Sequence, residues 1–305
     1  MKRREFLIKG AGIGLAGGLI SSFGGLHAVG MSAAEGEYDL VAVRGGEAAA
    51  MFERAIAKLG GMGQFVKPGQ KVLVKPNIGW DAPPERAANT NPQLISRVTK
   101  SCLDAGASEV VVFDHTCDEW ARCYRNSKIE EFAVNAGAKV RPGNNESFYK
   151  EVSIPQGKSL TTAKVHQILL DADVFINVPV LKHHSSTRVT LAMKNLMGVV
   201  WDRRYYHRND LSQCIADFLT YRKPDLNIID GYRMLTRNGP KGVTDSDVAD
   251  LKALIAGRDI VAVDAAATLM FGEKPENINH LRIAQEMGLG TMNLDNLSIS
   301  KIKMG

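Results

Sequence analysis

The chain has few cysteines, and their spacing is irregular. Only Cys102, Cys117, Cys123 and Cys214 are cysteine among 305 residues, and no Cys-x-x-Cys pair occurs. Because iron–sulfur clusters and zinc ribbons need closely spaced cysteines, we expect neither in this chain. Cys117 and Cys123 are near enough in sequence for a disulfide in an oxidising compartment, and the sequence leaves that pairing open.

A large excess of charge of one sign is also lacking. The net charge is +5, and residues 1–34 hold +3 of it, with four basic residues and one acidic residue. The remaining 34 basic and 32 acidic residues nearly cancel. Nucleic-acid-binding domains normally carry a strong basic excess. We therefore expect no nucleic-acid partner, and any cationic feature must be local.

Long apolar runs are scarce, and the longest candidate lies near the N-terminus. Residues 11–26 carry no charge, follow a basic segment and precede the small residues Ser32, Ala33 and Ala34. This order is typical of an export signal. We expect residues 1–34 to be that signal, cleaved or retained as a membrane anchor, and the protein to reach the periplasm.

The pair Arg3-Arg4, followed by Phe6, Leu7 and Lys9, resembles the twin-arginine export signal. The resemblance implies the twin-arginine translocase as a partner during export. That route carries folded proteins, which favours a cofactor or redox partner bound beforehand.

The rest of the chain, residues 35–305, alternates between β-branched runs and helical patterns. Near-continuous apolar strands separated by helices indicate a parallel sheet covered on both faces. We predict one doubly wound, mainly parallel α/β domain, with a lobe junction near residues 142–160. The expected strands are residues 39–44, 71–75, 109–114, 173–180, 226–230 and 259–264, and the expected helices are 46–60, 91–106, 211–222, 245–257 and 279–288.

Polar side chains follow most of the predicted strands at their carboxyl ends. Ligands of open parallel sheets bind at that edge, so we expect a site there. Aspartate also forms turns and caps, which leaves a structural role open for each aspartate. The residues are Lys75 and Asn77, Asp114, the run Lys182-His183-His184, Asp230 and Asp264.

These residue types predict roles in a site. The lysines and Asn77 would bind a small anionic ligand or a cofactor. Asp114, Asp230 and Asp264 would orient a histidine or hold a divalent metal, and mixed His and Asp ligands do not select among zinc, nickel, iron and manganese.

The stretch "NVPVLKHHSSTRVTLAMKNLMG", residues 177–198, carries the strongest signal. Adjacent residues of an extended strand point in opposite directions, so we expect one of His183 and His184 to face the site. The turn that follows would bring Lys194 and Asn195 back to it. A lysine near another cation or away from water loses proton affinity and can serve as a base or nucleophile.

Two later segments supply weaker candidates. His207 lies among arginines in "WDRRYYHRND", either as a third histidine beside an anion clamp or within a solvated loop. Gly239 and Lys241 lie in the turn "RNGPKG", whose backbone N–H groups would cradle an oxyanion.

Several motifs, taken together and in order, resemble the domain-of-unknown-function family 362. The resemblance covers most of residues 39–290 and includes "KVLVKPNIG", "INVPVLKHH", "TLAMKNLMG", "QCIADF", "IIDG" and "VAVDA". Some members carry ferredoxin-type cysteine clusters, which this chain lacks. The family implies the fold and the motif residues, and it has no general reaction to carry over.

A narrower resemblance involves His184, Lys194 and Gly198, whose spacing is similar to that in the nickel-pincer lactate racemases. In that family the histidine takes part in proton or hydride exchange, and the lysine holds the cofactor covalently. This chain departs from the pattern, since Asn195 follows the lysine and the glycine-rich run before it is missing.

Two classes of function remain open. The first is an exported enzyme that acts on a small anionic substrate, with His183, His184, Lys194 and His207 as candidate acid–base groups. The second is a non-catalytic periplasmic binding or redox-accessory protein. We favour the enzyme because so many titratable groups gather at one edge.

Overall fold

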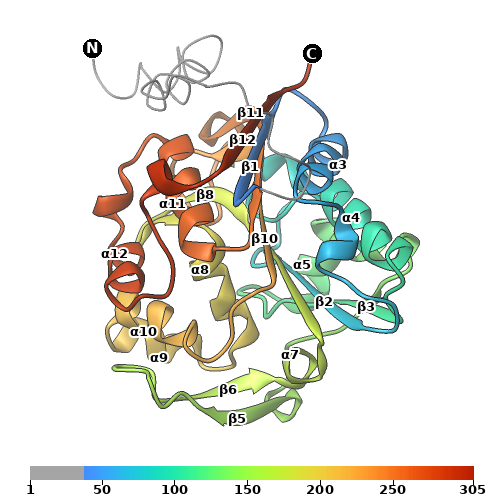
Figure 1. Cartoon of the computed structure of the whole chain (residues 1–305). Helices are drawn as coiled ribbons and strands as arrows, with labels where there is room; N and C mark the ends of the chain where they lie inside the picture. Colours follow the sequence, from blue (N-terminus) through green and yellow to red (C-terminus); the bar gives the residue numbers. More distant parts are fainter. Residues whose placement is uncertain (1–37) are drawn as a thin grey trace.

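The computed structural model describes residues 38–305, and the predicted signal lies outside them (Figure 1). A ten-stranded sheet crosses the molecule in the order β12-β1-β11-β10-β7-β2-β3-β4, with β8 and β9 attached beside β10. The strands are β1 Leu40–Arg44, β2 Lys71–Pro76, β3 Glu109–Val112, β4 Lys139–Val140, β7 Val174–Val178, β8 Val180–His184, β9 Arg188–Thr190, β10 Leu226–Leu235, β11 Val248–Gly257 and β12 Ile299–Lys303.

Helices cover both faces of this sheet (Figure 1). They are α3 Ala48–Lys58, α4 Pro92–Asp104, α5 Trp120–Asn126, α6 Ile129–Asn135, α7 Gln167–Asp171, α8 Ala192–Asn195, α9 Arg203–Arg208, α10 Leu211–Phe218, α11 Ile260–Phe271 and α12 Asn279–Glu286.

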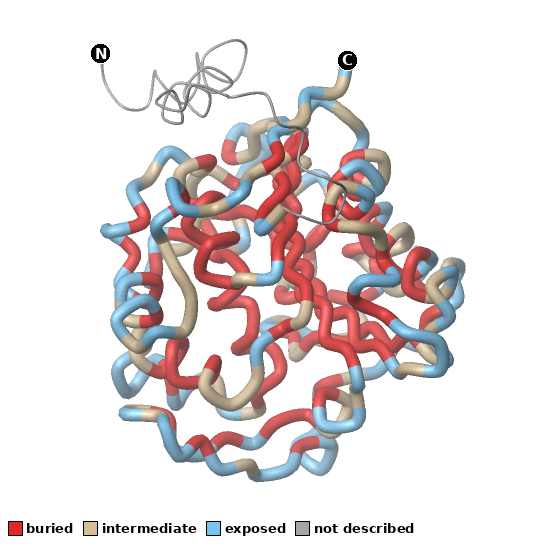
Figure 2. Tube along the Cα trace, viewed as in Figure 1, coloured by how far each residue is buried: buried red, intermediate tan, exposed pale blue. Residues whose placement is uncertain are grey.

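The strands are buried on both sides because their alternate residues enter two different cores. On β2, Leu73 packs with α8, α10, α11 and α12, whereas Val72 and Val74 pack with α3, α4, α5 and α6. The buried residues lie along the strands of the sheet and on the sides of the helices that face it (Figure 2). The predicted doubly wound, mainly parallel α/β fold is confirmed.

Parallel pairing brings the carboxyl ends of the central strands to one edge. β7 pairs in parallel with β2 and β10, and β2 pairs in parallel with β3. β8 continues from β7 and pairs in parallel with β10. The residues that follow β2 and β3 therefore lie close to β8.

Two predicted elements are wrong: one predicted helix is a strand, and one predicted strand is part of a helix. Residues 245–257, predicted as a helix, contain β11, which is antiparallel to both β1 and β10. Residues 259–264, predicted as a strand, begin α11. The run from Ile260 to Phe271 is twelve residues long, and the Asp259 side chain caps it by accepting from Val261 N and Ala262 N. Its length and this cap favour a helix over a strand.

The segment near residues 142–160 enters a separate two-stranded sheet. β5 (Tyr149–Ser153) pairs in antiparallel fashion with β6 (Thr162–His166), and this hairpin lies below the main sheet in Figure 1. Within residues 38–305, no helix combines the length and apolarity that a membrane crossing needs.

Candidate functional site

Lys75 and Asp114 form a buried ion pair at the carboxyl edge of the sheet. Lys75 lies on β2, Asp114 follows β3, and the parallel register of these strands places them side by side. Lys75 Nζ lies 2.8 Å from Asp114 Oδ1, and both side chains are almost inaccessible to solvent. The other carboxylate oxygen accepts from Ile78 N at 2.7 Å. Asp114 is thus held by a lysine and a backbone amide.

Lys182 approaches the same edge from β8. Its Nζ donates to Asn77 Oδ1 at 3.0 Å and to the backbone carbonyl of Ala88. Its side chain is 1% exposed. Neither partner is a carboxylate, so the charge of Lys182 has hydrogen bonds but no counter-ion in the described chain.

Asp264 brings Lys194 and Asn195 to this edge from the other side of the sheet. Its two carboxylate oxygens accept from Ala192 N at 2.6 Å and Met193 N at 2.9 Å, at the start of α8. α8 is only four residues long and fully buried. The carboxylate therefore satisfies two amides of the first turn and fixes the direction of the lysine that follows. The predicted strand-end position of Asp264 is wrong, because the residue lies within α11.

Four asparagine side chains link the strands beneath the lysines. Asn195 Oδ1 accepts from Asn77 Nδ2 at 2.9 Å, and Asn195 Nδ2 donates to Asn177 Oδ1 at 2.8 Å. Asn177 Nδ2 donates in turn to Asn227 Oδ1 at 3.1 Å. Asn177 and Asn227 are site residues that were not predicted from the sequence. Their signal is an amide in the middle of an otherwise apolar strand.

These groups surround a small cavity of about 70 Å³. Lys182, His184, Lys194 and Asn195 all line it, whereas His183 does not. The remaining lining residues are Asn77, Gly79, Trp80, Asp114, His115, Cys117, Thr190, Gly198, Arg203 and Pro240.

The two histidines of β8 point to different neighbours. His184 lines the cavity, and its Nδ1 accepts from Ser186 N at 3.0 Å. His183 Nδ1 accepts from Gly239 N at 3.0 Å. A Cβ on Gly239 would lie 1.9 Å from His183 O, so the close approach of these two segments requires glycine. The Gly239 amide is already used by His183 and is not free to cradle an oxyanion.

Three other predicted residues lie away from the cavity wall. His207 is exposed on α9. Lys241 forms an exposed ion pair, with its Nζ 2.7 Å from Asp118 Oδ2. Asp230 is buried, and its oxygens accept from Asn91 N at 2.7 Å and Tyr232 N at 3.1 Å, which holds the start of α4 against β10.

The three aspartates predicted as metal ligands do not converge. Asp114 is paired with Lys75, Asp230 binds backbone amides near α4, and Asp264 caps α8. Within residues 38–305, no three His, Cys, Asp or Glu side chains are grouped as ligands of one ion. The predicted set of Asp114, Asp230 and Asp264 is therefore not a single metal site.

Burial sets the proton affinity of the cavity groups. It lowers the pKa of Lys182 to about 7 and that of Lys194 to about 8. It also lowers the pKa of His184 to about 3, and the nearby amino groups of Lys194 and Lys182 add to this effect. An ammonium in a dry site costs free energy unless an anion compensates it. His184 is therefore neutral at pH 7, and both lysines titrate near neutrality.

Cys117 is a cavity residue that the sequence analysis did not assign to the site. All four cysteines are free thiols in the structure, and Cys117 alone among them is exposed. Its Sγ lies 3.3 Å from Arg203 Nη1. We expect a disulfide reagent such as dithionitrobenzoate to label one thiol per native chain rapidly, at Cys117, because the others are buried. Rapid labelling that persists in Cys117→Ser would contradict this, and absorbance at saturation gives the count.

The chain is similar to several known proteins. The Thylakoid-associated protein sll1697 of Synechocystis sp. is 25% identical over 252 residues, covering 80% of this chain and 76% of that protein. The structure of the lactate racemase apoprotein from Thermoanaerobacterium thermosaccharolyticum superposes with a TM-score of 0.48 at 9% identity, over 75% of this chain and 56% of the racemase. The family model described as "Domain of unknown function (DUF362)" matches residues 72–269, and the chain belongs to this family.

Proposed function

We propose that the cavity binds the acidic group of a small anionic substrate. The observation that carries this proposal is that Lys182 and Lys194, both buried, face one cavity without a carboxylate partner in the described chain. The Lys194 ammonium has one hydrogen-bond partner there, the thioether Sδ of Met197 at 3.3 Å. A carboxylate or phosphate between the two amino groups would supply the missing counter-charge.

Thr190 supports the same conclusion from an independent group. Its hydroxyl is buried at the cavity wall and has no hydrogen-bond partner in the described chain. A buried hydroxyl without a partner costs about 1–3 kcal/mol. A bound oxyanion could accept from it, alongside the two lysines.

Acid–base chemistry on that anion is the reaction class that the site supports best. His184 is neutral and can accept a proton from a bound substrate, while the Lys194 ammonium beside the anion can donate one. A bound anion raises the pKa of His184, which makes it a stronger base. The hydrogen bond from Asn77 to Asn195 ties the end of β2 to α8 and thereby positions Lys194.

Exchange of a carbon-bound hydrogen of the ligand with solvent deuterium tests the proposal, and it does not require the natural substrate to be known. The full chain is incubated in deuterium oxide with a set of carboxylic acids that carry a hydrogen on carbon 2, and proton NMR follows the loss of that signal. We expect catalysed exchange for at least one acid, and its loss in His184→Gln while binding of the acid is retained. Binding without exchange would favour the non-catalytic role, and absence of binding would contradict the anion site.

We also propose export by the twin-arginine route, supported by Arg3-Arg4 and the apolar run that follows. Replacing Arg3-Arg4 with two lysines should move the protein from the periplasmic to the cytoplasmic fraction of the host. An unchanged distribution would contradict this route.

A further inference from the structure

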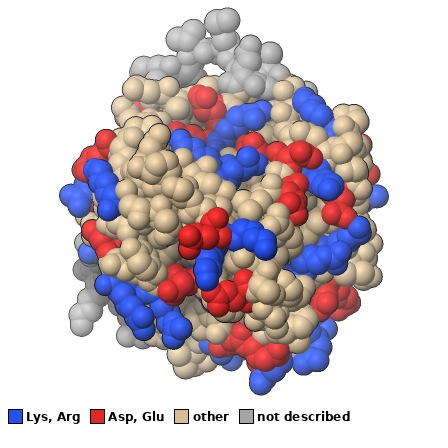
Figure 3. Space-filling view, turned by 90° about the horizontal axis from the view of Figure 1, so that it is seen from below, with Lys and Arg blue, Asp and Glu red and all other residues tan. Residues whose placement is uncertain are grey.

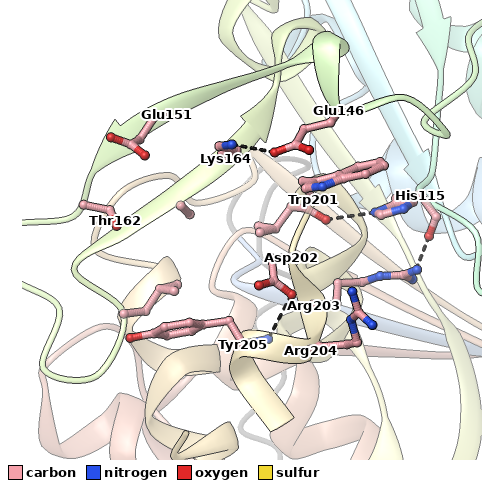
Figure 4. Close-up of a pocket in the computed structure, with 13 residues that line it drawn as sticks. His115, Glu146, Glu151, Thr162, Lys164, Trp201, Asp202, Arg203, Arg204 and Tyr205 are labelled. Atoms are coloured by element: carbon pink, nitrogen blue, oxygen red, sulfur yellow. Dashed lines mark hydrogen bonds and ion pairs between the residues drawn. The ribbon is translucent and has the colours of Figure 1, made fainter. Parts of the chain in front are cut away.

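A second and larger cavity, of about 580 Å³, adjoins the lysine cavity. It lies between the β5–β6 hairpin and the start of α9 (Figure 4). Glu146, Glu151 and Lys164 approach it from the hairpin side, and Asp202 and Tyr205 lie opposite. Trp201 lies next to the hairpin, because its backbone N donates to Lys164 O at 2.9 Å. The two walls come from segments far apart in the sequence, and nothing described so far uses the space between them.

The two cavities share His115 and Arg203 as lining residues. Arg203 Nη1 donates to His115 O at 2.8 Å, so its guanidinium is held at the common wall. The His115 ring stacks parallel to Trp201, with ring centroids 5.1 Å apart, and its Nδ1 lies 3.0 Å from Val200 O. His115 and Arg203 therefore contribute to the walls of both cavities.

The sizes of the cavities differ in a way that fits one extended ligand. About 70 Å³ holds an acid group and little more, whereas about 580 Å³ lies in the range of sites for whole small molecules. A ligand whose acid group reaches the lysines would leave its body in the larger space.

Most residues that line the larger cavity are polar or charged, with both signs present, and apolar atoms also contribute to its wall. Glu146 pairs with Lys164, and Glu151 lies across the hairpin from the same lysine. The exposed side chains of Glu151 and Arg204 form no hydrogen bond or ion pair in the described chain. Basic and acidic side chains are also interspersed over the face of the molecule seen from below (Figure 3). An apolar body would remove water from these groups without replacing its hydrogen bonds, whereas hydroxyl groups both donate and accept.

We propose that this cavity takes the hydroxylated body of the ligand, and that the substrate class is a sugar phosphate or sugar acid. This rests on the proposed anion site. The acid group lies with Lys182 and Lys194, and the ring lies between the hairpin and α9. Its hydroxyls donate to Glu151 and accept from Arg204, and its C–H face packs beside Tyr205, whose ring has an apolar body and a polar tip.

Calorimetry on the full chain with three probes tests this assignment. The probes are inorganic phosphate, glucose 6-phosphate and phenyl phosphate, which share the acid group and differ in the body. We expect glucose 6-phosphate to bind at least about tenfold more tightly than phosphate, and phenyl phosphate to gain less than about threefold. Glu151→Ala and Arg204→Ala should each reduce the gain and leave phosphate affinity unchanged. Glu286→Ala, at an exposed residue of α12 outside both cavities, should change nothing.

Each of the other outcomes would contradict a specific part of the proposal. Equal affinity for phosphate and glucose 6-phosphate would show that the larger cavity is not part of the site, while the proposed anion site would stand. Tighter binding of phenyl phosphate would show that the body is apolar and would refute the hydroxylated class. Absence of binding for all three would refute both the anion site and this extension of it.

Discussion

Replacing Lys194 by methionine should raise the stability of the protein and abolish anion binding. The lysine is buried, its ammonium contacts only the Met197 thioether in the described chain, and burial lowers its pKa from 10.5 to about 8. Methionine keeps most of the length and removes the charge, so we expect a gain of about 1–3 kcal/mol in the free energy of unfolding at pH 7. Sulfate affinity should fall by at least about 100-fold, since a buried charged contact is worth roughly 2–5 kcal/mol.

The pH dependence of stability checks the cause of this gain. Because the folded-state pKa of Lys194 lies below its unfolded value, the unfolded chain binds more protons between about pH 8 and 10.5. Stability conferred by this group therefore rises with pH across that window, by up to about 1.4 kcal/mol per pH unit. In Lys194→Met this contribution is absent, so the free energy of unfolding should rise less steeply with pH between about pH 8 and 10.5 than in the wild type. Urea unfolding at several pH values measures this dependence.

Lys241→Met is the matched control, because Lys241 is exposed and paired with Asp118. An exposed ion pair contributes about 0–1 kcal/mol, so this variant should keep sulfate affinity and nearly unchanged stability. A Lys194→Met protein that is less stable than wild type and still binds sulfate would show that the lysine has a structural role.

Gly198→Ala should destabilise the protein by roughly 3–5 kcal/mol, the cost of breaking a buried ion pair. A Cβ at this position would lie 1.9 Å from Asp114 Oδ1 and 2.7 Å from Lys75 Nζ. Both side chains are fully enclosed, so neither can move away without losing its partner. The Gly198 carbonyl also accepts from His115 N at 3.0 Å, which ties the turn after α8 to the end of β3.

Gly63→Ala serves as the control for Gly198→Ala. A Cβ on Gly63 meets nothing within 4 Å, so its stability should stay within about 0.5 kcal/mol of wild type. Thermal unfolding measures both variants. Equal melting temperatures for Gly198→Ala and wild type would mean that the turn can shift and that the ion pair is not as rigidly held as its geometry indicates.

The strand ends of the site follow from the sequence because parallel pairing has a simple geometric consequence. Lys75, Asp114 and Lys182 each lie at or just beyond a β-branched run, and parallel strands bring such positions to one edge. The apolar runs of β2, β3 and β7 are short and end at polar residues, so the strands can be predicted from the sequence. Alternation along β8 likewise separates His183 from His184.

The remaining features depend on contacts between segments far apart in the chain. Asp264 lies 72 positions after Ala192, whose N–H it caps at the start of α8, and no local sequence pattern marks that partnership. The predicted helix at β11 is wrong because a short apolar run fits both periodicities, and its pairing with β1 and β10 makes it a strand. The predicted strand at the start of α11 is wrong because the apolar run continues for twelve residues after its Asp259 cap. The larger cavity requires the β5–β6 hairpin to face α9, which only the tertiary structure determines.

Proton uptake on sulfate binding is the most direct test of the anion site. Sulfate stays doubly charged near pH 8, where Lys182 is mostly neutral and Lys194 is about half protonated. Bound sulfate should raise both pKa values, so calorimetry at pH 8 in two buffers of different ionisation enthalpy should show about one proton taken up per sulfate. Sulfate binding with no proton uptake, or no binding at all, would contradict the assignment of these two buried lysines to an anion site.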